Sequence, residues 1–145
     1  MLLIQFSLGC FLIIVTVVVH GVALDRLIFV LDRFNPYFAR KIELISTKCI
    51  VMVVTILCVF LSHAVQIWIW AIFYLVLDVV PDLESALYFS TSAFTTVGFG
   101  DIYLEKNWRL LSSFEAANGF ILFGWSTAFI FEIMNRAYAQ SKLQD

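Results

Sequence analysis

Long runs of apolar residues dominate the chain, and three of them are long enough to cross a membrane. An α-helix rises about 1.5 Å per residue and the hydrocarbon core of a bilayer is about 30 Å thick, so a span needs about 20 apolar residues. The runs cover residues 2–24, about 49–77 and about 108–134. This pattern predicts an all-α membrane protein with three transmembrane helices.

The first run begins directly after Met1, as the apolar part of a signal peptide does. However, no lysine or arginine precedes it, and it is longer than the roughly 7 to 15 apolar residues of a signal core. We therefore expect residues 2–24 to form a retained membrane helix.

Charged residues return between the first two runs. Five of them recur at roughly heptad spacing around the apolar residues 27–31: Asp25, Arg26, Asp32, Arg33 and Arg40. This pattern predicts either an amphipathic helix on the membrane surface or a continuation of the first span. Asn35-Pro36 is expected to end the helix, because proline lacks a donor and disfavours helix at the preceding residue.

Basic residues gather on one side of the predicted spans. Seven of the nine lysines and arginines lie within residues 25–48 or after residue 134. Cytoplasmic loops accumulate lysine and arginine. We therefore expect a multi-pass protein of the cell membrane, with its N-terminus outside and its C-terminus in the cytoplasm.

The composition agrees with a membrane protein and removes several other classes. The 145 residues are 62% hydrophobic and 14% charged, whereas soluble domains carry about 25% charged residues. The net charge is −2 and there is no basic run, so no nucleic-acid partner is expected. The three cysteines lack the spacing of a metal site or disulfide framework. No nucleophile–base or metal-ligating constellation stands out, so we expect neither an enzyme nor a bound cofactor.

Between the second and third runs, residues 81–94 have the pattern of a short helix. Pro81, Asp82 and Glu84 mark its N-terminus, because proline fits the first turn and acidic groups favour the positive end of the helix dipole. A helix ending at about Phe94 is too short to cross the bilayer. We therefore expect a re-entrant helix, which is tolerated only where it is buried in protein or lines water.

The next residues are Thr95-Thr96-Val97-Gly98-Phe99-Gly100-Asp101. This segment resembles the selectivity filter Thr-Val-Gly-Tyr-Gly of the potassium channel family, of the two-transmembrane pore-domain type, with phenylalanine in place of tyrosine. Successive carbonyl groups must all face the ion to replace its hydration shell, and glycine tolerates the positive φ values that this requires. The resemblance covers about residues 49–136, and the first helix lies outside it.

The resemblance implies a pore helix, a filter and an inner helix in that order. The chain would then comprise an N-terminal transmembrane helix with a cytoplasmic amphipathic segment (1–48), a pore domain (49–136) and a short cytoplasmic tail (137–145). One filter segment per chain implies a homotetramer, because the ring needs four strands. K⁺ is the expected permeant ion, bound by the main-chain oxygens of Thr96, Val97, Gly98 and Phe99 and by the Thr96 hydroxyl, with Gly100 completing the filter.

Filter support is expected from Thr95, Asp101, Ser92 and Tyr88. In many family members a filter tyrosine bonds to the pore helix, and in some a pore-helix glutamate pairs with the acid after the filter. Here Phe99 and Ser92 occupy those two positions. Both braces are therefore changed or lost, and we predict a filter more prone to rearrange or inactivate.

The last run contains candidates for the pore lining and the gate. Gly119 lies near the family's hinge glycine and Gly124 is a second candidate, although small residues also serve close helix packing. Ile121, Gly124, Ala128 and Glu132 recur at helical spacing and are expected to line the cavity. Glu132 either forms a ring that attracts cations or is a solvated acid at a helix end.

Two ionisable residues lie deeper in the apolar runs. Glu115 is expected to brace the pore helix through Ser92, Thr91 or His63, because an isolated buried carboxylate is costly. His63 is interpreted as a neutral, hydrogen-bonded packing residue, with proton sensing as the alternative.

These observations predict a potassium-selective channel that conducts passively in the lipid bilayer. The alternatives are a weakly selective cation channel and a non-conducting subunit that modulates a partner. The first helix is either an assembly clamp or a surface for an unidentified regulatory partner.

Overall fold

The computed structural model describes the main chain of residues 1–39 and 45–142 and the side chains of residues 1–33 and 48–137. These residues contain no strand. The helices are α1 (Leu2–Ala39), α2 (Ile45–Val76), α3 (Leu83–Phe94) and α4 (Arg109–Lys142). Three stretches within them are long and apolar enough to cross a membrane, namely Leu2–Arg33, Lys48–Val76 and Arg109–Ala137. The predicted fold class, three spans with a short helix between the second and third, is confirmed.

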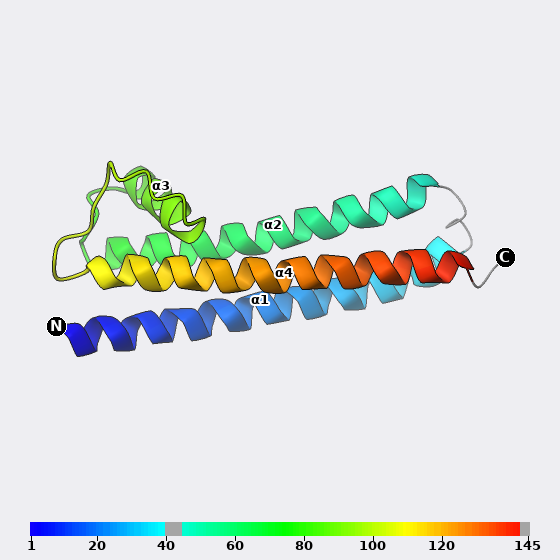
Figure 1. Cartoon of the computed structure of the whole chain (residues 1–145), viewed down its shortest axis with the longest axis horizontal. Coiled ribbons are helices and arrows are strands. Elements are labelled where there is room, and N and C mark those ends of the chain that lie inside the picture. Colours follow the sequence, from blue (N-terminus) through cyan, green and yellow to red (C-terminus); the bar gives the residue numbers. More distant parts are fainter. Residues whose placement is uncertain (40–44, 143–145) are drawn as a thin grey trace.

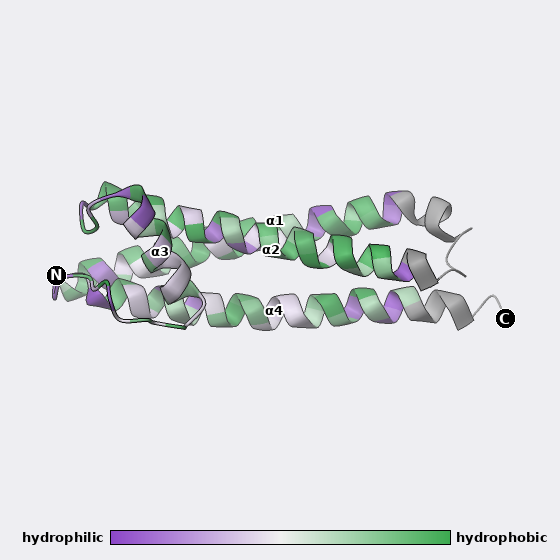
Figure 2. Cartoon of the chain, turned by 90° about the horizontal axis from the view of Figure 1, so that it is seen from above, coloured by the Kyte–Doolittle hydropathy of each residue, from purple (hydrophilic) through white to green (hydrophobic). Residues whose placement is uncertain are grey.

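The three long helices lie side by side (Figure 1). Helices α1 and α4 run in the same direction and α2 runs in the opposite one, while α3 lies at the end of the bundle where α1 and α4 begin. The N-terminus of the chain and the segment between α3 and α4 are therefore at the same end. Apolar residues recur along all three long helices (Figure 2), and many of their side chains are exposed, as a lipid environment requires.

The predicted break at Asn35-Pro36 is wrong. Helix α1 continues through both residues to Ala39, so the charged segment extends the first span as one continuous helix. Proline removes only the hydrogen bond that its own nitrogen would donate, and the remaining bonds of a long helix hold the chain on both sides of it. Arg40, the last member of the heptad pattern, lies outside the described residues.

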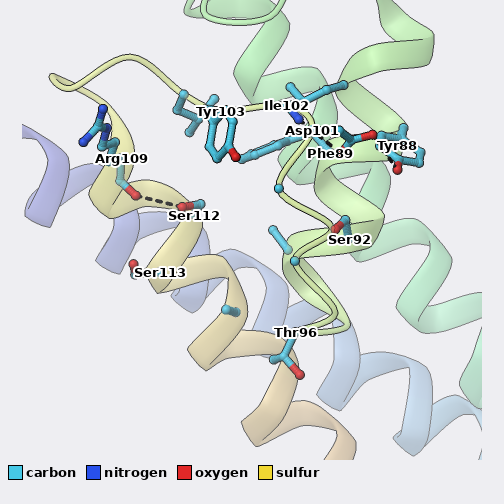
Figure 3. A pocket seen from close by; sticks show the side chains of 15 residues that line it. Tyr88, Phe89, Ser92, Thr96, Asp101, Ile102, Tyr103, Arg109, Ser112 and Ser113 are labelled. Carbon is cyan, nitrogen blue, oxygen red and sulfur yellow. Dashed lines mark hydrogen bonds between the residues drawn. The ribbon is translucent and has the colours of Figure 1, made fainter.

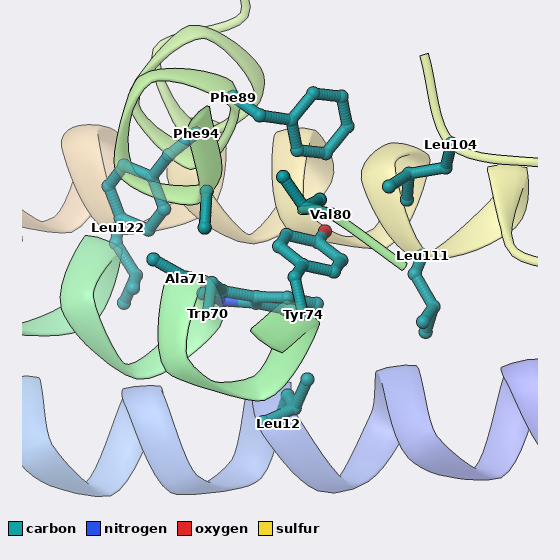
Figure 4. Close-up of a cluster of buried hydrophobic side chains, with 11 residues drawn as sticks. Leu12, Trp70, Ala71, Tyr74, Val80, Phe89, Phe94, Leu104, Leu111 and Leu122 are labelled. Atoms are coloured by element: carbon teal, nitrogen blue, oxygen red, sulfur yellow. The ribbon is translucent and has the colours of Figure 1, made fainter. Parts of the chain in front are cut away.

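The main apolar cluster lies between α2, α3 and α4 at the end of the bundle that contains α3 (Figure 4). Trp70, Tyr74 and Phe94 are its largest fully buried members, and Leu12 joins it from α1. The aromatic rings meet edge to face, with 5.3 Å between the centroids of Tyr74 and Phe89. This cluster seats the short helix α3 against the long helices.

Gly119 provides the closest contact between α3 and α4. A Cβ atom at this position would lie 2.0 Å from the carbonyl oxygen of Phe94, the last residue of α3. Around Gly124, by contrast, a Cβ would meet nothing within 4 Å in the chain. Of the two roles considered for Gly119, the structure therefore supports close packing.

Candidate functional site

The start of α3 is set by a capping residue. The Asp82 carboxylate accepts hydrogen bonds from the Ser85 N–H at 2.9 Å and the Ser85 hydroxyl at 2.8 Å. These bonds lower the pKa of Asp82, since they stabilise the charged carboxylate. The sequence prediction of a helix N-terminus at this point is confirmed, and the cap determines where α3 begins relative to the filter segment.

After α3, the φ angle of the main chain alternates in sign from residue to residue. Thr96, Gly98 and Gly100 have φ values of 62°, 57° and 78°, whereas Val97 and Phe99 between them do not have positive φ. Glycine adopts this conformation readily, but a β-branched threonine does so only at a cost of about 1–2 kcal/mol. Strain of this kind clusters at functional sites. The alternation places successive amide groups on one side of the chain and successive carbonyls on the other.

Ser92 of α3 accepts hydrogen bonds from two main-chain amides of the filter segment, residues 96–100. The Gly98 N–H donates to the Ser92 carbonyl at 3.2 Å, and the Phe99 N–H donates to the Ser92 hydroxyl at 3.1 Å. The amide side of the segment therefore faces the pore helix. Of the two outcomes expected where the family has a glutamate, a changed or a lost brace, Ser92 shows the first, because it bonds to the main chain of the filter segment.

A second contact joins the segment after the filter to α3. The Tyr88 hydroxyl donates to the Asp101 carboxylate at 2.8 Å, and the Tyr88 ring stacks on Phe99 with centroids 6.0 Å apart. The hydrogen bond to Asp101 raises the pKa of Tyr88, because the neutral hydroxyl is the donor. Tyr88, Ser92, Phe99 and Asp101 are thus brought together, as the sequence predicted for filter support.

The remaining predicted support residue, Thr95, caps α3 instead of contacting the filter. Its N–H and its hydroxyl both donate to the Thr91 carbonyl, at 3.1 Å and 2.7 Å. These bonds end α3 and start the turn that leads into Thr96.

Glu115 braces the pore helix, but through different partners from those predicted. It accepts hydrogen bonds from Ser90 at 2.5 Å and from Tyr74 at 2.7 Å, and it is fully buried. The prediction of Ser92, Thr91 or His63 as its partner is wrong, because the rotation of α3 about its axis turns Ser90 towards α4. Glu115 therefore joins α2, α3 and α4 at one point.

Four of the five lining and gate candidates share the open face of α4. Ile121, Gly124, Ala128 and Glu132 are exposed in the single chain, whereas Gly119 is buried. The Glu132 carboxylate accepts a hydrogen bond from Arg136 at 2.8 Å, and both side chains are more than half exposed. This face of α4 is uncovered in the single chain, and Glu132, which is paired with Arg136, lies near one end of it.

A cavity of about 490 Å³ lies between α3, the filter segment and the start of α4 (Figure 3). Thr96, Asp101, Tyr103 and Arg109 are among the residues that line it. Close by, the side chains of Val97, Phe99 and Tyr103 are 56%, 68% and 76% exposed. Large apolar and aromatic side chains gathered at the end of the bundle, outside its spanning part, are typical of a surface covered by a further protein surface.

Sequence reasoning missed several buried polar residues: His20, Ser62, Gln66, Tyr74, Ser90 and Ser126. All are buried, and five of them lie in the long apolar helices α1, α2 and α4. A polar side chain within a span marks an internal contact, because lipid cannot satisfy it. That signal was available for His20 and Gln66, but their partners depend on helix rotation.

Comparison with known proteins matches this region to a family. A family model described as an ion channel matches residues 49–136, which is more than half of the chain. No curated protein and no solved structure matches the chain. The matched residues contain α3, the filter segment and the candidate lining face, whereas α1 lies outside them.

Proposed function

Because the chain belongs to this ion-channel family, we propose that it conducts potassium ions passively and selectively through a pore formed by four copies. The observation that carries the proposal is the main chain of residues 96–100. Positive φ values alternate with ordinary ones, and the amides of Gly98 and Phe99 are bonded to Ser92. The carbonyl oxygens on the opposite side of the chain are left without a partner from α3.

Such a row of oxygens has the chemistry of a potassium filter. Main-chain carbonyls replace the water molecules around an ion, provided that enough of them surround it. In the proposed filter, one chain would supply the main-chain oxygens of Thr96, Val97, Gly98 and Phe99 together with the Thr96 hydroxyl. Complete coordination requires further copies of the same segment, which supports a closed ring of subunits.

The exposed side chains beside the filter support assembly in the same way. Val97 and Phe99 are more than half exposed in one chain. Phe99 already stacks on Tyr88 of its own α3 on one side. A neighbouring subunit would cover the exposed surface, and four copies would bury the re-entrant helix as a membrane requires.

The test measures ion flux through purified protein in lipid vesicles, together with the mass of the assembly. We expect a tetramer whose potassium flux far exceeds its sodium flux. Equal potassium and sodium fluxes would support a weakly selective cation channel. A verified tetramer without any flux would support a non-conducting subunit.

A matched variant ties the flux to the backbone geometry. Gly98→Ala adds a Cβ at a positive φ, which costs about 1–2 kcal/mol, although a Cβ there would meet no atom within 4 Å in the chain. We expect this variant to assemble but to lose selectivity. Unchanged selectivity would contradict the role assigned to residues 96–100.

A further inference from the structure

A closed ring of hydrogen bonds joins α1, α2 and α4 in the interior of the bundle. Its members are His20 of α1, His63 and Gln66 of α2, and Ser126 of α4, and Ser62 is attached to it. All five are buried, with exposed fractions of 7% or less. The two imidazole rings stack with centroids 5.0 Å apart and an angle of 21° between their planes.

Four contacts close the ring. His63 Nδ1 lies 3.3 Å from Gln66 Oε1, and Gln66 Nε2 lies 2.9 Å from His20 Nδ1. The other nitrogen of each histidine meets the same hydroxyl, because Ser126 Oγ lies 3.1 Å from His20 Nε2 and 2.9 Å from His63 Nε2. Every ring nitrogen of both histidines therefore has one partner in the ring.

Donor and acceptor counting shows that this ring closes with both histidines neutral. His63 Nδ1–H donates to Gln66, Gln66 Nε2–H donates to His20 Nδ1, His20 Nε2–H donates to Ser126, and the Ser126 hydroxyl donates to His63 Nε2. Turning the Gln66 amide over reverses all four bonds and closes the ring equally well. In either direction, each neutral imidazole donates once and accepts once.

An added proton cannot be taken up without breaking or redirecting a hydrogen bond of this arrangement. A protonated imidazole donates from both nitrogens, so the bond that it previously accepted is broken or the Ser126 hydroxyl must turn away. The positive charge would also lie against a second imidazole at 5.0 Å. A movement of the helices that admits water between them would relieve both costs.

The described charged groups on the surrounding helices do not offset this charge. On α1, Asp25 and Arg26 are exposed and lie more than one turn beyond His20. The part of α2 between residues 49 and 76 carries no formal charge. On α4, Glu115 is bonded to Tyr74 and Ser90 and Glu132 to Arg136. On α3, Glu84 is exposed in the first turn, at the end of that helix away from Phe94.

The ring lies beside a groove on one side and near the start of the filter segment on the other. The groove, of about 420 Å³ between α1 and α2, is lined mainly by apolar side chains together with Arg26 and Ser62, and the Ser62 hydroxyl lies 3.1 Å from His20 Nδ1. On the other side, the His63 ring packs against Phe94 with centroids 5.8 Å apart. Phe94 ends α3, two residues before Thr96.

We propose that the ring is a proton-binding site through which acid loosens α1 from the pore domain and reduces conduction. Protonation of His20 breaks the one ring bond that it accepts, from Gln66 of α2 or from Ser126 of α4 according to the direction of the ring, and places a charge between the helices. The displaced His63 ring moves Phe94 and with it the start of the filter. The site assigns a function to α1, which lies outside the residues matched by the family model.

The first test measures the protonation of His20 and His63 directly and does not depend on conduction. The chain contains only two histidines, so isotope labelling of histidine gives one set of nuclear magnetic resonance signals for each. We expect both to be neutral at about pH 7.5 and to change together below the range of an exposed histidine, as the pH falls towards about 4. Two histidines that titrate independently, as exposed imidazoles do, would overturn the proposal.

The second test measures potassium flux from vesicles buffered at the same pH on both sides. We expect a several-fold fall in flux between about pH 7.5 and about pH 4. The double variant His20→Gln, His63→Gln keeps hydrogen-bonding groups but takes up no proton, and its flux should not change over this range. Glu115→Gln is the control, because it removes a different buried acid and should leave the pH dependence intact.

The outcomes separate this proposal from the proposed function. Flux in the double variant that falls with acid as in the wild type would overturn the proton site while leaving potassium conduction unaffected. Absence of flux at every pH would contradict the proposed function, and the histidine signals would still decide the proton site. If the double variant fails to assemble, those signals in the wild type provide the decision.

Discussion

Helix α4 is held on two sides, and the two contacts differ in kind. Towards α3 the contact is a direct fit of main chain against main chain, at Gly119 and the Phe94 carbonyl, with Glu115 bonded to Ser90 beside it. Towards α1 it combines Gly9, which packs against the Phe114 side chain, with polar side chains spaced along the helix. The Thr16 hydroxyl accepts a hydrogen bond from the Asn118 side-chain amide at 2.7 Å, and His20 Nε2 lies 3.1 Å from Ser126 Oγ.

The difference follows from the membrane environment. Lipid is as apolar as leucine, so apolar burial by itself does not select one helix pairing over another, and small residues and buried polar groups do so instead. The α3 contact uses shape and tolerates no added atom. The α1 contact packs a glycine against a side chain, which can turn, and adds hydrogen bonds, which can be exchanged or protonated. This comparison indicates that α3 is held more rigidly against α4 than α1 is.

Gly119→Ala should have the largest effect. Its Cβ would lie 2.0 Å from the Phe94 carbonyl oxygen, so α3 or α4 must move, and overpacking of this kind costs about 1–3 kcal/mol or more. We expect loss of potassium flux and of the assembled form in size-exclusion chromatography. Gly124→Ala is the matched control, because it meets nothing within 4 Å in the chain, and it should assemble normally. Equal behaviour of the two variants would contradict the shape-based contact.

Glu115→Leu should have the next largest effect. The Tyr74 hydroxyl would lose its acceptor within the bundle, which costs about 1–3 kcal/mol. Thermal unfolding of the purified assembly should show a lower midpoint than the wild type. In Glu115→Gln, the amide oxygen still accepts from Tyr74, and the amide nitrogen can donate to Ser90 while Ser90 donates to the Ile67 carbonyl. A glutamine variant as unstable as the leucine variant would show that the carboxylate itself is required.

Thr16→Val tests the α1 side and should have a smaller effect. The substitution keeps the shape of the side chain but removes the acceptor of the Asn118 amide. A hydrogen bond between membrane helices contributes about 0.6 kcal/mol on average. We expect normal assembly and flux at neutral pH, with a slightly lower unfolding midpoint. Loss of assembly would mean that α1 is as rigidly held as α3.

Phe99→Tyr should have the smallest effect on stability. Its expected effect is on the rate at which the potassium current decays. Phe99 is mostly exposed and stacks on Tyr88, so an added hydroxyl can be accommodated and can bond to the pore helix or to a neighbouring subunit. We expect a slower decay of potassium current than in the wild type. Identical decay would remove the missing hydroxyl as a cause of filter rearrangement.

The site was predicted unevenly from the sequence. The start of α3 near Pro81 and Asp82 and the glycines at positive φ were predicted because both are local properties of a few adjacent residues. The partners of Glu115 were wrong, and the contact of Ser92 with the Phe99 amide was not foreseen. Both depend on how far α3 is rotated about its axis, and a short helix packed on several sides carries no pattern that shows this rotation.

The sequence alone determined the three spans, the re-entrant helix and the backbone of the filter segment, because run length, a capping residue and glycine act within a few residues of the chain. Only the tertiary structure decided that Gly119 packs against α3, that α1 continues through Pro36, and that His20 and His63 share one hydroxyl. The long helices are apolar on nearly all sides, so their sequences do not mark which face is buried. The register between them is set by contacts that exist only once the helices lie together.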